Sequence, residues 1–288
     1  MEIKEDIPHR ISSVYKNMSK GQKNLSAYIL SSFDKAAYLT ASKLGELVGL
    51  SESTVVRFAY MLGYEGYPKF QRALQEMLRN KLTSVQRAEI VSGLETSMVL
   101  KSTLKADMEN IRLTIEDADS ETFEKVVDSI LKARSIYILG LRSAVPLVQF
   151  MGYYFNFIFN NIRIVTSGVN DIFEQLIHAG PEDVLIAISF PRYARRTVEA
   201  IALTKLKGTT VIALTDSSLS PLAQYADHTL LARSDMASFA DSLVAPLSLI
   251  NALIIAVGIS KKGDVSTEFS RLESIWDKYN VYVGKDDV

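Results

Sequence analysis

The 288-residue chain contains no cysteine. Disulfide bonds and thiolate metal sites are therefore excluded, and a reducing cytoplasm is the compartment that this composition favours. Histidine is also scarce, because only His9, His178 and His228 occur, far apart and without the spacing of metal ligands. The sequence predicts neither a metal site nor a bound cofactor.

Long apolar runs are missing as well. The two most apolar stretches, residues 144–159 and 243–259, are shorter than the roughly 20 residues that span a bilayer, and each contains a proline. The first ten residues are acidic and lack the apolar run of a signal peptide. We interpret both stretches as helices buried on most sides, in a core or a subunit interface, and predict no membrane association.

The net charge of −1 conceals an uneven distribution. Residues 1–82 carry 12 Lys and Arg against 8 Asp and Glu, a net charge of +4, and the remainder carries 20 against 25, a net charge of −5. A basic region joined to an acidic one is typical of a nucleic-acid-binding domain attached to a second domain. The chain is long enough for two domains with separate cores.

Residues 41–62, ASKLGELVGLSESTVVRFAYML, have the pattern of two short amphipathic helices joined by a turn. Apolar residues of the second segment recur at helical spacing, at Val55, Phe58, Ala59 and Leu62. Its opposite face carries hydrogen-bond donors and a cation, which suit base edges and phosphates. We predict DNA contacts from Ser51, Ser53, Thr54, Arg57, Tyr60 and, in the following helix, Lys69.

The segment before the turn has a predicted inner face of Leu44, Leu47 and Val48. Gly49 can adopt the positive φ that the turn requires, and Ser51 is the expected N-cap of the second helix. The alternative interpretation is an ordinary helical hairpin, because amphipathic helix pairs are common.

Further helices surround this motif. Ser19 and Gln22 form the pattern of a capping box and predict a helix over residues 19–33, and Pro68 opens another helix that ends near residue 79. We therefore predict an all-α helix-turn-helix domain over residues 1–80.

Residues 81–105 are predicted to be a linker, because few large side chains recur there at regular spacing. The second predicted domain covers residues 106–288. A helix leads into it, with apolar residues at helical spacing at Leu104, Met108, Ile111 and Ile115.

Five short β-branched segments follow, mostly separated by stretches of helix length. Near-continuous apolar strands that alternate with helices predict a parallel sheet covered on both faces, the α/β doubly wound fold. The expected strands are residues 135–139, 162–166, 183–189, 209–215 and 228–232.

Ligands of doubly wound sheets bind outside the carboxyl ends of the strands. The loops there are rich in hydroxyl groups and contain four arginines. Arg195 and Arg196 fall in the expected first turn of a helix, where a cation is disfavoured by about 0.3–1 kcal/mol. An anionic ligand, or an acidic group of a partner subunit, would reverse that effect. The alternative is that these arginines are solvated or pair with carboxylates such as Glu199.

Residues 44–74, LGELVGLSESTVVRFAYMLGYEGYPKFQRAL, closely resemble the helix-turn-helix domain of the RpiR (MurR/RpiR) family of bacterial transcriptional regulators. The second domain resembles the sugar isomerase (SIS, flavodoxin-like) domain in its strand order, in Gly140 and Ser143, in Ser189, and in SPLAQYAD at residues 220–227. The resemblance implies a regulator that binds a phosphorylated sugar and changes its hold on an operator. It also implies that Ser143, Ser189 and Thr197 are hydroxyl ligands of the phosphate.

Two positions depart from the family pattern. Arg142 stands where a small glycine is usual, and Phe190, Pro191 and Arg192 replace a serine-glycine pair. Because these changes place bulk and positive charge where a phosphate usually reaches backbone N–H groups, we hypothesise a more acidic or differently shaped anion held by the arginines. The predicted ligand-binding residues are Arg142, Ser143, Ser189, Arg192, Tyr193, Arg195, Arg196 and Thr197.

The resulting prediction is a regulator that senses a phosphorylated sugar or a related anionic carbohydrate derivative. It acts on double-stranded operator DNA as a homodimer or tetramer, since a symmetric partner must read the second half-site. The alternative is an enzyme, a phosphosugar aldose-ketose isomerase, which needs a general base. Glu174 and His178, one helical turn apart, are the candidates, and a solvated helix face is the competing interpretation.

Overall fold

A computed structural model describes residues 7–81, 85, 95–235 and 240–283. The chain divides into two compact units, Met1–Arg87 and Ala88–Val288. Each unit has an apolar core of its own.

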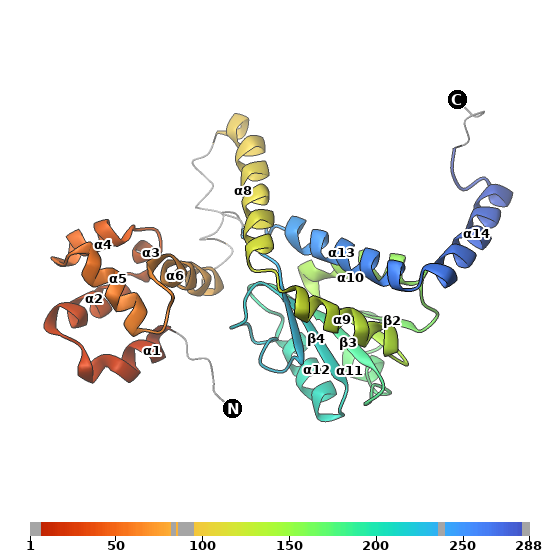
Figure 1. The fold of residues 1–288 in the computed structure, drawn as a ribbon, viewed down its shortest axis with the longest axis horizontal. Helices are drawn as coiled ribbons and strands as arrows, with labels where there is room; N and C mark the ends of the chain where they lie inside the picture. Colours follow the sequence, from red (N-terminus) through yellow and green to blue (C-terminus); the bar gives the residue numbers. More distant parts are fainter. Residues whose placement is uncertain (1–6, 82–84, 86–94, 236–239, 284–288) are drawn as a thin grey trace. The chain divides into compact units, whose positions relative to one another are not determined.

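The first unit is a group of short helices around one core (Figure 1). Leu25, Phe58 and Phe70, from three different helices, are fully buried in it. The described part of this unit is helical without strands, as predicted, although its first helix was not anticipated. The helices are α1 Ile7–Val14, η1 Tyr15–Asn17, α2 Lys20–Ser31, α3 Phe33–Ala36, α4 Ala41–Val48, α5 Glu52–Met61 and α6 Tyr67–Lys81.

Two of these helices begin at residues that favour a helix N-terminus. The predicted capping box is present before α2, where Ser19 N donates to Gln22 Oε1 at 2.9 Å and Gln22 N donates to Ser19 Oγ at 3.3 Å. Pro68 lies in the first turn of α6, where its missing N–H costs no helical hydrogen bond.

Helices α4 and α5 form the predicted helix-turn-helix. Gly49 ends α4 with a φ of 70°, the left-handed conformation that the turn needs. Gly45 is needed for close packing, because a Cβ there would lie 2.6 Å from the carbonyl oxygen of Leu50. Leu44 is buried as predicted, but the prediction that Leu47 belongs to the inner face is wrong, since it is 58% exposed and Gly45 faces inward in its place.

The second unit contains a five-stranded parallel sheet with the order β2-β1-β3-β4-β5. The doubly wound fold is thereby confirmed, and every strand end lies within one residue of its predicted place. The strands are β1 Ile136–Gly140, β2 Ile162–Val165, β3 Val184–Ile188, β4 Thr210–Thr215 and β5 His228–Leu231. The helices are α8 Thr96–Glu116, α9 Ser120–Lys132, η2 Arg142–Ala144, α10 Val145–Phe155, α11 Ile172–Gln175, α12 Arg195–Leu206, α13 Val244–Ser260 and α14 Lys262–Tyr279.

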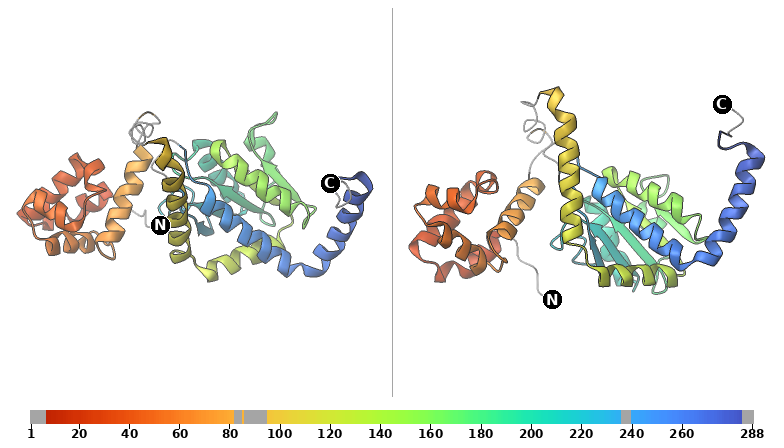
Figure 2. Two further views of the ribbon diagram at one scale, coloured as in Figure 1. Left: turned by 90° about the horizontal axis from the view of Figure 1, so that it is seen from above. Right: turned by 45° about the horizontal axis from the view of Figure 1, so that its top comes forward.

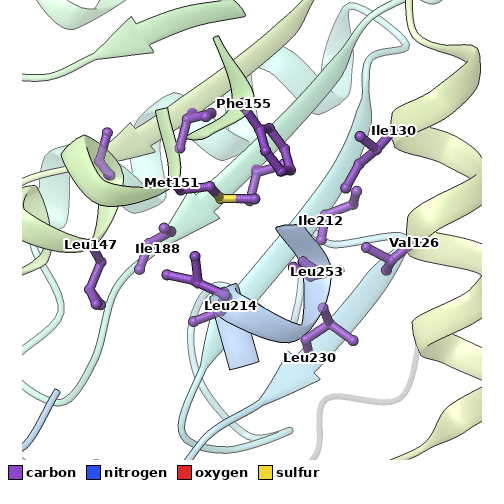
Figure 3. Close-up of a cluster of buried hydrophobic side chains, with 14 of the residues drawn as sticks. Val126, Ile130, Leu147, Met151, Phe155, Ile188, Ile212, Leu214, Leu230 and Leu253 are labelled. Atoms are coloured by element: carbon purple, nitrogen blue, oxygen red, sulfur yellow. The ribbon is translucent and has the colours of Figure 1, made fainter. Parts of the chain in front are cut away.

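Helices cover both faces of the sheet (Figure 2). Because successive strand residues point to opposite faces, Ile138 packs with α9, α10 and α13, while its neighbour Leu139 packs on the side of α11 and α12. Figure 3 shows the first of these cores, in which Met151 of α10 and Leu253 of α13 meet Ile212 of β4.

Helices α8, α10 and α13 of this unit keep apolar side chains in solvent. The predicted apolar face of α8 is not its buried face, because Leu104, Met108 and Ile115 are 55%, 69% and 70% exposed, whereas Leu113 is buried. Residues 96–105, within the predicted linker, are the first part of α8. Helices α10 and α13 are each buried on one side only. In the described ranges, every helix is too short or too polar to cross a membrane.

Candidate functional site

The outward face of α5 carries the residues predicted to contact DNA. Ser53, Arg57 and Tyr60 are exposed and Thr54 is half-buried, while Val55 on the inner face is fully buried. The face therefore offers hydroxyl donors and one guanidinium to a nucleic acid without disturbing the core. Lys69 is also exposed, on α6.

Ser51 occupies the predicted N-cap position of α5, with φ −72° and ψ 151°. Its hydroxyl makes no capping hydrogen bond to the backbone. It lies 3.0 Å from Ser53 Oγ and 2.9 Å from Thr54 Oγ1 instead. Arg57 Nε donates to Ser53 O at 3.3 Å, so the guanidinium lies along its own helix. The start of α5 is thus a small cluster of hydroxyl groups on the surface.

The second candidate site lies where strand order reverses, between β1 and β3. The two strands are paired, with Gly140 beside Ile188, yet the next strands, β2 and β4, lie on opposite sides of this pair. In open α/β sheets the crevice at such a switch point is where ligands bind. The loops that start at Leu141 and at Ser189 therefore leave the sheet side by side.

Both loops hold an arginine in a strained backbone conformation. Arg142 has a φ of 58° and Arg192 a φ of 65°. A non-glycine residue in this region costs about 1–3 kcal/mol, and such strain persists where the surrounding structure imposes it, often at functional sites. Both side chains are exposed. Each of the two departures from the family pattern thus contains one of the two strained residues of the switch point.

Two helices begin at this edge of the sheet with no side chain capping them. The N-cap residues of α10 and α12 are Ala144 and Ala194, whose methyl side chains cannot accept a hydrogen bond from the first turn. The helix dipole favours an anion at both places, but the free N–H groups lie at α12, because at α10 the N–H of Val145 donates to Arg142 O and Pro146 has none. Helix α11, in contrast, is capped by Asp171.

Hydroxyl groups lie at these same helix starts. Thr197, in the first turn of α12, is fully buried, and its Oγ1 makes no hydrogen bond in the described part of the chain. Ser189, at the end of β3, is 6% exposed, and Ser143, just before α10, lies in solvent. A buried hydroxyl without a hydrogen-bond partner is unfavourable. A ligand that forms a hydrogen bond with it would remove that cost.

Tyr193 connects this site to the end of β4. Its hydroxyl donates to Asp216 Oδ1 at 2.7 Å, and Asp216 is 1% exposed. Asp216 was not among the predicted ligand-binding residues. Its place directly after a buried strand, at the carboxyl edge, was the available signal.

The two arginines of the first turn of α12 have carboxylate partners. Arg195 Nε donates to Glu199 Oε1 at 2.7 Å, which is the alternative that the sequence left open, and the Arg195 side chain is 90% exposed. Arg196 pairs with Asp171 and lies 5.3 Å from the ring centre of Phe173. The backbone N–H of Phe173 and the Arg196 guanidinium hold the pKa of Asp171 below its ordinary value. Arg196 thereby ties α12 to the loop after β2.

The proposed general-base pair is not arranged as a pair. Helix α11 ends at Gln175, so Glu174 and His178 do not share a helix face as the sequence suggested. The Glu174 carboxylate accepts the backbone N–H of Asp171 at 3.2 Å and completes a capping box. Glu174 thus has a structural task.

Family models match both units. The helical unit matches the helix-turn-helix domain of the rpiR family over residues 6–81, and the α/β unit matches the SIS domain over residues 129–256. The class of protein defined by fold and sites is a two-domain transcriptional regulator. Its N-terminal unit is a helix-turn-helix domain of the rpiR family, and its second unit contains a SIS domain.

Individual relatives share this organisation. A Haemophilus influenzae protein described as an uncharacterised HTH-type transcriptional regulator is 28% identical over 231 residues, which cover 78% of this chain and 79% of that protein. The sugar isomerase domain of an RpiR transcription factor from Sphaerobacter thermophilus is 26% identical, with a TM-score of 0.59, and covers 62% of this chain and 99% of its own. The Vibrio vulnificus NanR protein, complexed with ManNAc-6P, has the same fold at 20% identity, with a TM-score of 0.57 and coverage of 93% and 97%.

Proposed function

We propose that this regulator acts in the cytoplasm, binds a phosphorylated sugar or a related anionic carbohydrate derivative in its SIS domain, and thereby changes its affinity for operator DNA. One observation carries the ligand part of the proposal. At the switch point, two strained arginines, two uncapped helix N-termini and the buried hydroxyl of Thr197 converge on one edge of the sheet. An anion interacts favourably with the arginine charges and the helix N-termini and gives the Thr197 hydroxyl a hydrogen-bond partner, while the strained loops hold the arginines at this place.

A sugar phosphate matches this chemistry in two respects. Its phosphate accepts hydrogen bonds from Thr197, from Ser189 and from the backbone N–H groups at the start of α12. Arg142 and Arg192 add two positive charges at the mouth of the site, which favours a ligand with more negative charge than a neutral sugar ring bearing one phosphate. The fold itself accommodates such a ligand in NanR, which is complexed with ManNAc-6P.

Isothermal titration against a panel of sugar phosphates and related sugar acids tests the ligand class. Arg142→Ala and Arg192→Ala should each weaken binding about tenfold or more, because each removes a charged hydrogen-bond donor. Arg195→Ala is the matched comparison and should have a smaller effect, since its guanidinium already pairs with Glu199. Unchanged affinity in both Arg142→Ala and Arg192→Ala would contradict the proposal.

We further propose that α10 and α13 form a subunit interface, in a homodimer or tetramer that presents two reading helices to an operator. Helix α13 carries no charged residue, yet its Ile255 and Ile259 are 61% and 69% exposed. An uncharged apolar face of this kind is typical of an interface between subunits.

Sedimentation velocity tests this interface. Ile255→Glu should convert the oligomer to monomer, because a carboxylate would be desolvated in the contact. Leu206→Glu is the matched control, on α12 at the opposite face of the sheet and 88% exposed. A wild-type chain that sediments only as monomer at micromolar concentration would count against the interface.

A further inference from the structure

A polar network joins α8 to the segment that follows β5. Asn110 of α8 donates from Nδ2 to Asp235 O at 2.7 Å, and its Oδ1 accepts from Asp235 N at 3.1 Å. Arg233 N donates to Thr114 Oγ1 at 2.9 Å, and Arg233 Nε donates to Asp117 Oδ2 at 3.1 Å. The segment is therefore fastened to one face of α8 through both its backbone and its side chains. We call these five residues the α8 latch.

The latch is buried, which makes its geometry specific. Asn110 is 1% exposed and Arg233 is 7% exposed. Buried polar groups must keep their partners, so a network of this kind favours one register of the helix against the segment. Apolar packing, as at Leu113 of the same helix, is not directional and fixes no register.

A short series of hydrogen bonds leads from the latch to the ligand site. Ala232 N, next to Arg233, donates to Thr215 O at 2.9 Å. Thr215 directly precedes Asp216, the acceptor of the Tyr193 hydroxyl. The loop that carries Tyr193 is therefore connected to α8 through the ends of two adjacent strands, β4 and β5.

We propose that the α8 latch transmits ligand binding from the switch-point loops to α8. This inference rests on the proposed function, because it assumes an anion bound beside Tyr193. A ligand that shifts Tyr193 moves its partner Asp216, then the ends of β4 and β5, and the directional bonds to Asn110 and Thr114 pass the change to the helix. Among the described residues of its unit, helix α8 comes first along the chain after the helix-turn-helix unit, so it is the element through which a change would reach the DNA-binding part.

Hydrogen–deuterium exchange of the full chain tests the latch. Amides of α8 within residues 107–116 are followed with and without 6-phosphogluconate, a phosphorylated sugar acid, and again with inorganic phosphate. In the wild type a bound probe should slow or accelerate their exchange by about fivefold or more, the usual lower size of a coupling between sites. Thr114→Val removes the acceptor for Arg233 N and keeps the side-chain shape. Asn110→Ala independently removes both hydrogen bonds to the backbone of Asp235.

Both variants should bind the probe as tightly as the wild type in isothermal titration and lose the probe-dependent change in α8. Thr103→Val, on the same helix at a threonine whose hydroxyl makes no hydrogen bond in the described structure, should keep it. If the latch were purely structural, both variants would show faster α8 exchange than the wild type, and the probe would still change that exchange as it does in the wild type. That result would overturn the inference. So would a probe that binds the wild type without altering α8. If neither probe binds the wild type, the proposed ligand class fails and the inference fails with it.

Discussion

The two candidate sites of this protein are built in opposite ways. On α5 the outward residues Ser53, Arg57 and Tyr60 stand on an unstrained helix whose inner residues fill the core. At the switch point of the sheet the candidates stand on loops, where Arg142 is held at positive φ and the hydroxyl of Thr197 is buried without a partner in the described structure.

Because of this difference, substitutions at the two sites should affect stability and binding differently. A change on the outer face of α5 alters what the helix contacts and leaves the fold unaffected, because nothing inside the unit depends on those side chains. At the switch point, stability and binding are opposed, because the features that suit an anion cost free energy in its absence. Substitutions should therefore move stability and affinity in opposite directions at one site only.

Thr197→Val is the sharpest test of that opposition. It should weaken ligand binding by about 1.5–3 kcal/mol, the usual value of a hydrogen bond to a charged group, while the melting temperature stays unchanged or rises. Thr204→Val is the matched control on the same helix, because Thr204 is also fully buried but its Oγ1 donates to Ala200 O at 3.0 Å. It should lower stability and leave affinity unchanged. A loss of stability in Thr197→Val without loss of affinity would remove the contrast.

Arg57→Ala should weaken operator binding by about 1–3 kcal/mol if the guanidinium reads a base, with specificity relaxed at one position. If it contacts phosphate, the loss should be equal on all sequences, and the salt dependence should fall by about one charge. Thermal stability should not change. Lys35→Ala, an equal loss of charge on α3, is the control. Fluorescence anisotropy at several salt concentrations distinguishes the outcomes, and wild-type affinity for every DNA would exclude Arg57 from the interface.

Arg142→Gly and Arg142→Ala separate backbone strain from charge. Glycine adopts positive φ without cost, so Arg142→Gly should be about 1 kcal/mol more stable than Arg142→Ala in urea unfolding. Both should bind the ligand equally weakly, since both lack the guanidinium. Equal stability of the two variants would show that the left-handed conformation is not maintained in solution.

Glu174→Gln should have the smallest effect. Glutamine can still accept the backbone N–H of Asp171, so the capping box survives and stability should change by only a few tenths of a kcal/mol. DNA binding and its response to ligand should be those of the wild type. Turnover of a phosphosugar that is present in the wild type and lost in Glu174→Gln would instead establish the isomerase alternative.

The spacing of apolar residues predicted the positions of the regular strands and of most helices. The strands were located to within one residue, because a parallel sheet covered on both faces needs near-continuous apolar runs. The same spacing predicted the wrong buried residues where burial depends on contacts with segments distant in the sequence. Leu47 and Met108 fit an apolar face but lie in solvent, whereas Asn110 is buried because residue 235 supplies both of its hydrogen-bond partners.

The sequence by itself determined the two domains, the outer face of α5 and the carboxyl edge of the sheet as the place for a ligand, because local spacing and strand type specify them. Only the tertiary structure decided which residues act together there. Arg195 pairs along its own helix while Arg196 reaches Asp171, and Tyr193 finds Asp216. The latch between α8 and the end of β5 joins residues more than a hundred positions apart. Such pairings depend on how the strands are ordered in space, and spacing along the chain carries no record of that order.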